Sequence, residues 1–205
     1  LTGLLAGAAT GLLHPKLKIP ALLAGILTMI ALYSVNLRVM GKANLSLLRV
    51  DTLFSTLRDS AGFSNAQAVV CVGIVSSFVI GGLLYWYSGT EIGAAIRAPG
   101  FNPQIIRAQT VDTHLTIILG LLISNALVAL SGALVAQNNG FADVGMGTGT
   151  IVIGLASVII GEVLFGTRSF KNCIISVVLG SIVYRLVIAA VLQMGMPPND
   201  LKLFT

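Results

Sequence analysis

Residues 65–87 read NAQAVVCVGIVSSFVIGGLLYWY, a run without a single Lys, Arg, Asp or Glu. A helix that crosses the ~30 Å hydrocarbon core of a bilayer needs about 20 mostly apolar residues, and this run is long enough. It ends in Tyr85, Trp86 and Tyr87, and Trp and Tyr are enriched where a membrane meets water. The run therefore predicts a membrane-spanning helix.

The same pattern recurs along the chain. We expect further spans at residues 20–37, 114–136, 147–166 and 173–194, and the end of another at 1–13. That last segment carries Gly3, Gly7 and Gly11, a spacing that lets a second helix approach closely. Hydrophobic residues make up 56% of the chain and charged residues 9%, against about 25% charged in soluble domains.

Long apolar runs without alternation do not fit the short dyad-patterned strands of a membrane β-barrel. Backbone groups in lipid must then be satisfied within helices. We therefore predict an all-α, polytopic transmembrane helical bundle that forms a single domain over residues 1–205. Because the chain starts and ends beside apolar sequence and lacks an initial Met, we expect it to be truncated at both ends.

The charges indicate an orientation. The net charge of +5 needs no nucleic-acid partner, because basic residues concentrate beside spans on the cytoplasmic side of membrane proteins. Segments 14–18, 91–112 and 167–172 together hold six of the 12 Lys and Arg residues. Most of the other bases lie in 38–64, a longer polar segment that counts for less in this rule. We expect 91–112 to be cytoplasmic.

That segment reads EIGAAIRAPGFNPQIIRAQTVD. Pro99-Gly100 is expected to break any helix, and Asn102-Pro103 to begin a short one over 103–110, because Asn caps helices and Pro suits the first helical position. The short helix would carry Gln104 and an apolar patch from Ile105 and Ile106, with Arg107 pointing to water or a partner. By itself it fits a connector on lipid headgroups or a docking helix equally well.

The segment resembles the cytoplasmic loop of bacterial ABC importer permeases of the branched-chain amino acid/ribose type, whose pattern is approximately G-x-A-x-R-A-x-G-x-N-P. The matching residues here are Gly93, Ala95, Arg97, Ala98, Gly100, Asn102 and Pro103. Ile19-Pro20 and Thr28 resemble another stretch of the family, although Met29 stands where the family has Gly. Within the family, the chain is most similar to the tryptophan/tyrosine-type, or uncharacterised transport system, permeases.

The resemblance implies a permease subunit of an ATP-driven importer, for an amino acid or similar small solute, in the bacterial inner membrane. It implies a homodimer that docks a cytoplasmic ATP-binding subunit and receives solute from an extracytoplasmic substrate-binding protein. The expected ATPase-coupling residues are Arg97, Gly100, Asn102, Pro103, Gln104, Ile105, Ile106 and Arg107.

Catalytic and cofactor motifs are missing from the sequence. It contains no G-x-x-x-x-G-K-[ST] phosphate loop, so ATP and Mg²⁺ would be used by the partner subunit. It has no His, Cys, Asp and Glu cluster with metal-ligand spacing, and Cys71 and Cys173 suit small hydrophobic positions. We expect no metal, no cofactor bound by this chain and no enzymatic activity.

Polar residues inside spans, or directly after one in the case of Gln137, are the candidates for the translocation path: Thr28, Asn125, Gln137 and Arg185. An Arg within a span is costly unless it faces protein or water, so Arg185 either anchors to a neighbouring span or contacts solute or a gate. Thr hydroxyls often bond their own helix backbone instead. The alternative function is an autonomous ion-coupled carrier or facilitator, for which Glu162 is the one acidic residue within a span.

Overall fold

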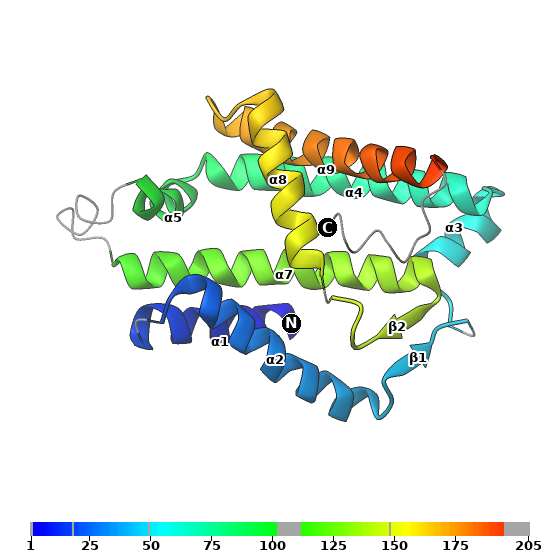
Figure 1. The fold of residues 1–205 in the computed structure, drawn as a ribbon, viewed down its shortest axis with the longest axis horizontal. Helices are drawn as coiled ribbons and strands as arrows, with labels where there is room; N and C mark the ends of the chain where they lie inside the picture. Colours follow the sequence, from blue (N-terminus) through cyan, green and yellow to red (C-terminus); the bar gives the residue numbers. More distant parts are fainter. Residues whose placement is uncertain (1, 18, 49, 102–111, 148, 195–205) are drawn as a thin grey trace. The chain divides into compact units, whose positions relative to one another are not determined.

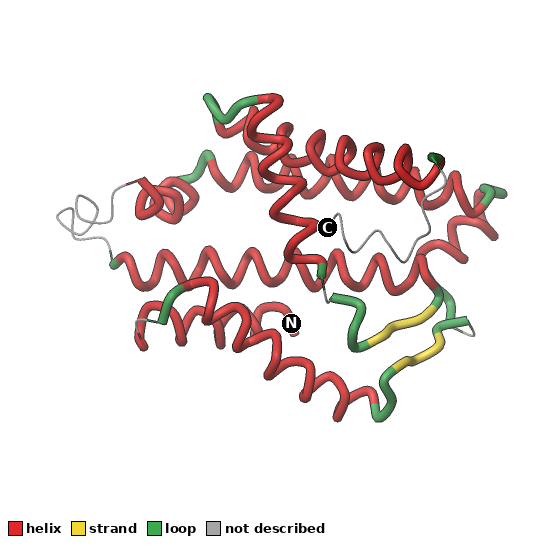
Figure 2. The backbone as a smooth tube through the Cα atoms, viewed as in Figure 1, coloured by secondary structure: helices red, strands yellow, loops and turns green. Residues whose placement is uncertain are grey.

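The computed structural model describes residues 2–17, 19–48, 50–101, 112–147 and 149–194. The chain is mostly helical (Figures 1 and 2). Its helices and strands are, in order, α1 (Thr2–Leu17), α2 (Ala21–Met40), β1 (Asn44–Ser46), α3 (Leu53–Ala61), α4 (Asn65–Ser88), α5 (Glu91–Phe101), α7 (Thr113–Asn139), β2 (Phe141–Asp143), α8 (Thr150–Phe165) and α9 (Phe170–Gln193).

Among the described residues, four helices, α2, α4, α7 and α9, are long and apolar enough to cross a membrane, and α8 is a shorter apolar helix. Large apolar side chains on these helices are exposed; Phe78 and Val163 are each 78% exposed. Lipid tails are as apolar as leucine, so such surfaces are stable in a bilayer. The prediction of a polytopic helical membrane protein is confirmed.

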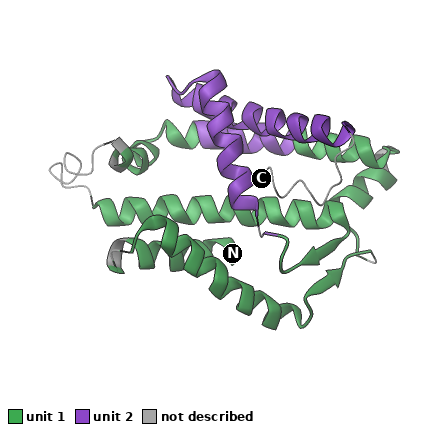
Figure 3. Cartoon of the chain, in the orientation of Figure 1, with its two compact units in different colours: residues 1–74, 86–146 green, residues 75–85, 147–205 purple. Residues whose placement is uncertain are grey.

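The chain divides into two compact units (Figure 3). Unit 1 comprises Leu1–Ile74 and Trp86–Met146, and unit 2 comprises Val75–Tyr85 and Gly147–Thr205. The helix α4 contributes to both units. Most of the candidate functional residues, including all those described in the predicted cytoplasmic segment, lie in unit 1.

In unit 1, α1 packs antiparallel along α7 through three glycines. A Cβ on Gly3 would lie 2.6 Å from the carbonyl oxygen of Asn125, and one on Gly7 would lie 2.7 Å from that of Leu121. Gly11 continues the contact one turn further, against Ile118. The predicted close helix approach is therefore present, with α7 as the partner.

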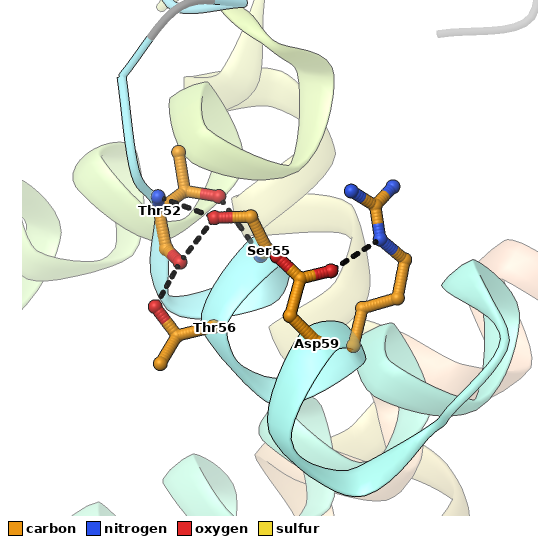
Figure 4. Close-up of polar contacts among 5 residues, drawn as sticks. Thr52, Ser55, Thr56 and Asp59 are labelled. Atoms are coloured by element: carbon orange, nitrogen blue, oxygen red, sulfur yellow. Dashed lines mark hydrogen bonds and ion pairs between the residues drawn. The ribbon is translucent and has the colours of Figure 1, made fainter.

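The far end of α7 carries a small ribbon and a short helix. β1 and β2 pair antiparallel, with Asn44 opposite Asp143. The helix α3 begins at a capping box (Figure 4): the Thr52 hydroxyl accepts from the Ser55 backbone N–H at 3.2 Å, and the Ser55 hydroxyl accepts from the Thr52 N–H at 2.8 Å. Such reciprocal bonds satisfy two of the N–H groups that a helix start leaves unpaired.

In unit 2, α8 and α9 form a close antiparallel pair around Gly161 and Gly180. The unit 2 part of α4 lies beside the first turns of α9, where a Cβ on Gly81 would lie 3.6 Å from Ile174. Lys171 places its Nζ 5.1 Å from the centre of the Tyr85 ring, a cation–π distance. The basic start of α9 thus lies beside the aromatic end of α4.

Three details differ from the sequence-based predictions. The first helix continues through Pro15 for one further turn and ends at Leu17, not at residue 13. Residues 91–101 form a helix, so Pro99-Gly100 does not break it; a proline near a helix end removes one backbone hydrogen bond and leaves the earlier turns intact. The two short strands were not predicted from a purely helical pattern.

Candidate coupling and translocation sites

The first candidate site is the corner between α4 and α5. The C-terminus of a helix leaves its last carbonyl groups without partners in the helix. Here the N–H of Gly89 donates to the Trp86 carbonyl at 3.1 Å, and that of Thr90 donates to the Tyr87 carbonyl at 3.0 Å. The Ser88 carbonyl accepts from Nη2 of Arg97 at 2.7 Å. Three terminal carbonyls are therefore satisfied by residues at the corner.

Arg97 makes this contact from the second turn of α5. Its Nε also donates to the Gly93 carbonyl at 3.3 Å, and the side chain is half-buried. A cation at a helix C-terminus is stabilised by the helix dipole by about 0.3–1 kcal/mol, and more where it is partly buried. The guanidinium is therefore held toward the chain's own backbone.

Thr90 and Gly93 fix the angle of the corner. The Thr90 hydroxyl donates to the Tyr87 carbonyl at 2.6 Å and accepts from the Gly93 N–H at 3.2 Å, as a residue that caps a helix start does. Gly93 is buried, and a Cβ there would overlap the Tyr87 carbonyl oxygen and lie 2.7 Å from the Ser88 Cα. No larger residue fits at Gly93 without moving the two helices apart.

The helix α5 also contacts α7. A Cβ on Gly120 would lie 3.2 Å from Cγ2 of Ile96. Gly100, near the end of α5, has open space around it. Asn102, Pro103, Gln104, Ile105, Ile106 and Arg107, which complete the predicted coupling set, lie outside the described residues.

The structure places two path candidates at helix contacts. Thr28 is 6% exposed; its hydroxyl donates to the Ala24 carbonyl at 2.9 Å and accepts from Thr10 at 2.9 Å, which joins α2 to α1. Asn125 is half-buried in α7, and its Nδ2 donates to the Leu121 carbonyl at 2.9 Å. The backbone carbonyl of Asn125 packs against Gly3 of α1. Both side chains are bonded to helix backbone.

Gln137 lies at the other end of α7. Its Oε1 accepts from the Leu53 N–H at 3.1 Å, so this side chain holds the first turn of α3. A residue of the translocation path needs a side chain that can contact solute. The amide oxygen of Gln137 instead accepts a hydrogen bond from the backbone of α3. No pattern in the sequence indicates that bond, because it joins residues far apart in the chain.

Arg185 differs from the other candidates because its side chain is exposed on α9. At 1.5 Å per residue it lies ~12 Å from the Gln193 end of the helix and ~22 Å from the Phe170 end. Its neighbours Leu186 and Ile182 are exposed as well. The charge therefore sits well inside an apolar surface.

Tyr184, the residue before Arg185, was not among the predicted site residues. It is 8% exposed, and its hydroxyl has no hydrogen-bond partner among the described residues. Buried polar atoms are nearly always paired, so an orphaned hydroxyl calls for an explanation. No group of three His, Cys, Asp or Glu residues that could hold a metal occurs in the part of the chain that the structure describes.

Comparison with known proteins identifies the family. A family model described as "Branched-chain amino acid transport system / permease component" matches residues 1–204. The chain belongs to this permease family. The predicted resemblance is thereby confirmed, as is the expected location in a membrane.

Two curated relatives of this permease cover nearly its whole length. It is 40% identical over 205 residues to a tyrosine transport system permease protein of Clostridioides difficile (strain R20291), a match that covers 100% of this chain and 66% of the relative. It is 35% identical over 201 residues to an uncharacterised protein of Rickettsia prowazekii (strain Madrid E), with coverage of 96% and 69%. The chain thus spans about two thirds of the relatives' length. No solved structure matches it.

Proposed function

We propose that this chain is the membrane-spanning part of a permease subunit in an ATP-driven importer of an amino acid or similar small solute. The observation that carries the proposal is the family match over residues 1–204. Within the cytoplasmic segment with the permease pattern, residues 91–112, the part that follows α5 would receive the ATP-binding subunit. ATP and Mg²⁺ would be bound by that subunit and not by this chain.

The geometry of unit 1 supports this division of sides. Gly11 near the end of α1, and Ile96 of α5, both contact the N-terminal half of α7. The ribbon of β1 and β2, together with α3, lies at the C-terminal end of α7 (Figure 1). Segments 14–17 and 91–101, which carry Lys16 and Arg97, therefore share one end of α7, as the proposed cytoplasmic placement requires.

The solute and the other partners follow from the family and its relatives. A relative that is 40% identical carries a name that describes tyrosine transport, which supports an amino acid as the solute. We propose delivery by an extracytoplasmic substrate-binding protein, to the side that holds β1, β2 and α3. A second copy of the permease would complete the path as a homodimer in the bacterial inner membrane.

Within this scheme, Arg185 is the strongest candidate for the path. An exposed Arg so far from either helix end needs water or protein beside it, because lipid solvates the charge poorly. We propose that it faces the aqueous path or the second copy. Asn125 retains an amide oxygen that can accept a hydrogen bond from solute, whereas Thr28 and Gln137 would act mainly through the helix contacts that they hold.

The mechanism is alternating access driven from outside the chain. ATP binding shifts an equilibrium between two states only if the ATP-binding subunit contacts them differently. The short segment after α5 would provide those contacts. Its displacement would reach α4 and α7 through α5, which touches both helices.

Co-purification tests the proposal. The full-length permease would be expressed with a candidate ATP-binding subunit, as wild type, as an Ile106→Asp/Arg107→Glu double variant, and as Lys42→Glu, a control beyond the other end of α7. We expect wild type and the control to retain the subunit and solute-stimulated ATP hydrolysis, and the double variant to lose both. Solute uptake by the permease alone, without any ATP-binding subunit, would overturn the proposal in favour of a facilitator.

A further inference from the structure

We propose that Arg97 is a positioning residue that locks α5 onto the end of α4 and does not itself dock the ATP-binding subunit. This inference rests on the proposed function, because it concerns how force from a docked subunit enters the membrane helices. The inference divides the segment with the permease pattern into two parts. Residues 93–97 hold α5 against the end of α4, and the part that follows α5 docks the subunit.

The Arg97 side chain is directed toward the end of α4. Its guanidinium donates to the carbonyls of Ser88 and Gly93, at 2.7 and 3.3 Å. Both acceptors belong to this chain, and one of them is the terminal carbonyl of α4. A guanidinium offers five donors in a fixed fork, so these bonds orient the whole group toward the α4 terminus. That orientation suits a clamp between two helices.

The corner between α4 and α5 has no room for a side chain at position 93. Gly93 lets the α5 backbone rest on Tyr87 and Ser88, where any Cβ would overlap. Thr90 bonds both sides of the corner through one hydroxyl. We expect a rotation of α5 to move α4 as well, because the residues between the two helices are hydrogen-bonded to α4. The two connecting residues, Gly89 and Thr90, both donate backbone N–H groups to α4 carbonyls.

The same turn of α5 also reaches α7. Ile96 lies between Gly93 and Arg97 in sequence, and it contacts Gly120 of α7. One turn of α5 is therefore fastened to the end of α4 and rests on the side of α7. A pull on the chain after Phe101 would act on both helices together. Arg97 is the charged link in this arrangement, and its loss would let α5 move without α4.

The test compares three variants in the full-length permease, co-expressed with its ATP-binding subunit and reconstituted in vesicles with its binding protein. We expect Arg97→Gln to retain co-purification and basal ATP hydrolysis. Solute uptake per ATP hydrolysed should fall by about tenfold or more, the scale of a lost charge-assisted hydrogen bond. Arg97→Lys, which keeps a charged donor, should restore part of the coupling. Gly93→Ala, which wedges the corner without changing charge, should uncouple as Arg97→Gln does.

The outcomes separate this inference from the proposed function. Loss of co-purification in Arg97→Gln, with Gly93→Ala behaving as wild type, would mean that Arg97 contacts the subunit directly and would overturn the inference. Unchanged coupling in both variants would also overturn it. Failure of the wild-type permease to retain the subunit would instead reject the proposed function. Should Arg97→Gln not accumulate in the membrane, Gly93→Ala and Arg97→Lys decide by the same coupling ratio.

Discussion

The backbones of α8 and α9 touch at Gly161 and Gly180. A Cβ on Gly180 would lie 2.6 Å from the Cα of Gly161, and one on Gly161 would overlap the carbonyl oxygen of Ser176. Two helices that meet at this distance gain van der Waals contact along their whole crossing, which is a main driving force for helix association in lipid. The α8–α9 pair is therefore stabilised mainly by close contact between the two backbones, which the lack of side chains at Gly161 and Gly180 permits.

This contact predicts opposite effects for two alanine substitutions on one helix. Gly161→Ala should destabilise the hairpin by about 1–3 kcal/mol, the usual cost of overpacking. Gly154→Ala, on the same helix but with open space around its Cβ position, should be neutral or slightly stabilising because Ala favours helix. Thermal unfolding of the full-length permease in detergent measures both. Equal midpoints for the two variants would contradict the close contact.

Loss of the α3 cap should loosen α3 alone. Thr52→Ala removes the hydroxyl that accepts from the Ser55 N–H, at a cost of about 0.5–2 kcal/mol. Thr56→Ala, one turn later on an exposed side chain, is the matched control. Hydrogen exchange over residues 53–61 should accelerate in the first variant and remain near wild type in the second. Unchanged exchange in Thr52→Ala would argue against the cap.

The Thr10–Thr28 bond predicts that Thr28 acts through helix packing. Thr28→Val removes the acceptor of a buried hydroxyl pair, and such bonds contribute about 0.6 kcal/mol on average within membranes. We expect a small drop in the unfolding midpoint with uptake retained, and Thr28→Ser should restore the midpoint. A large change in the solute concentration for half-maximal uptake, with unchanged stability, would place Thr28 in the path instead.

The Tyr184 hydroxyl, which has no hydrogen-bond partner in the described part of the chain, predicts an unusual response to Tyr184→Phe. Removing a buried hydroxyl that lacks a partner relieves a desolvation cost of about 1–3 kcal/mol, so the variant should be as stable as wild type or more stable. A marked loss of stability would show that the hydroxyl has a partner in the assembled transporter. Uptake measured alongside shows whether that partner matters for transport.

The sequence predicted the membrane helices well because their signal is local. An apolar run of sufficient length, as at residues 65–87, predicts a span without knowledge of its neighbours. Gly3, Gly7 and Gly11 also indicated a close helix contact, but the choice of α7 as partner depends on residues more than a hundred positions away. The pairing of Asn44 with Asp143 is equally non-local, and strands this short carry no periodic pattern.

The candidate sites were less predictable, for a different reason. Residue type and family pattern selected Arg97 for the coupling segment, but they could not show that its guanidinium turns back to the Ser88 carbonyl. Gln137 and Thr28 were selected as polar groups at the end of a span or within one, and each has a hydrogen-bond partner on another helix. The orphaned hydroxyl of Tyr184 emerges only from its three-dimensional surroundings. Composition identifies the polar groups, and packing decides which of them are available.

If the segment after α5 docks the ATP-binding subunit, it must lie on the cytoplasmic side of the membrane. A Gln104→Cys variant, in a full-length background with Cys71→Ala, Cys173→Ala and any other cysteine replaced, would be treated with a membrane-impermeant maleimide. We expect labelling in inside-out vesicles and none in intact spheroplasts. Labelling in intact spheroplasts would place the segment outside the cell, where no ATP-binding subunit could reach it, and would contradict the account.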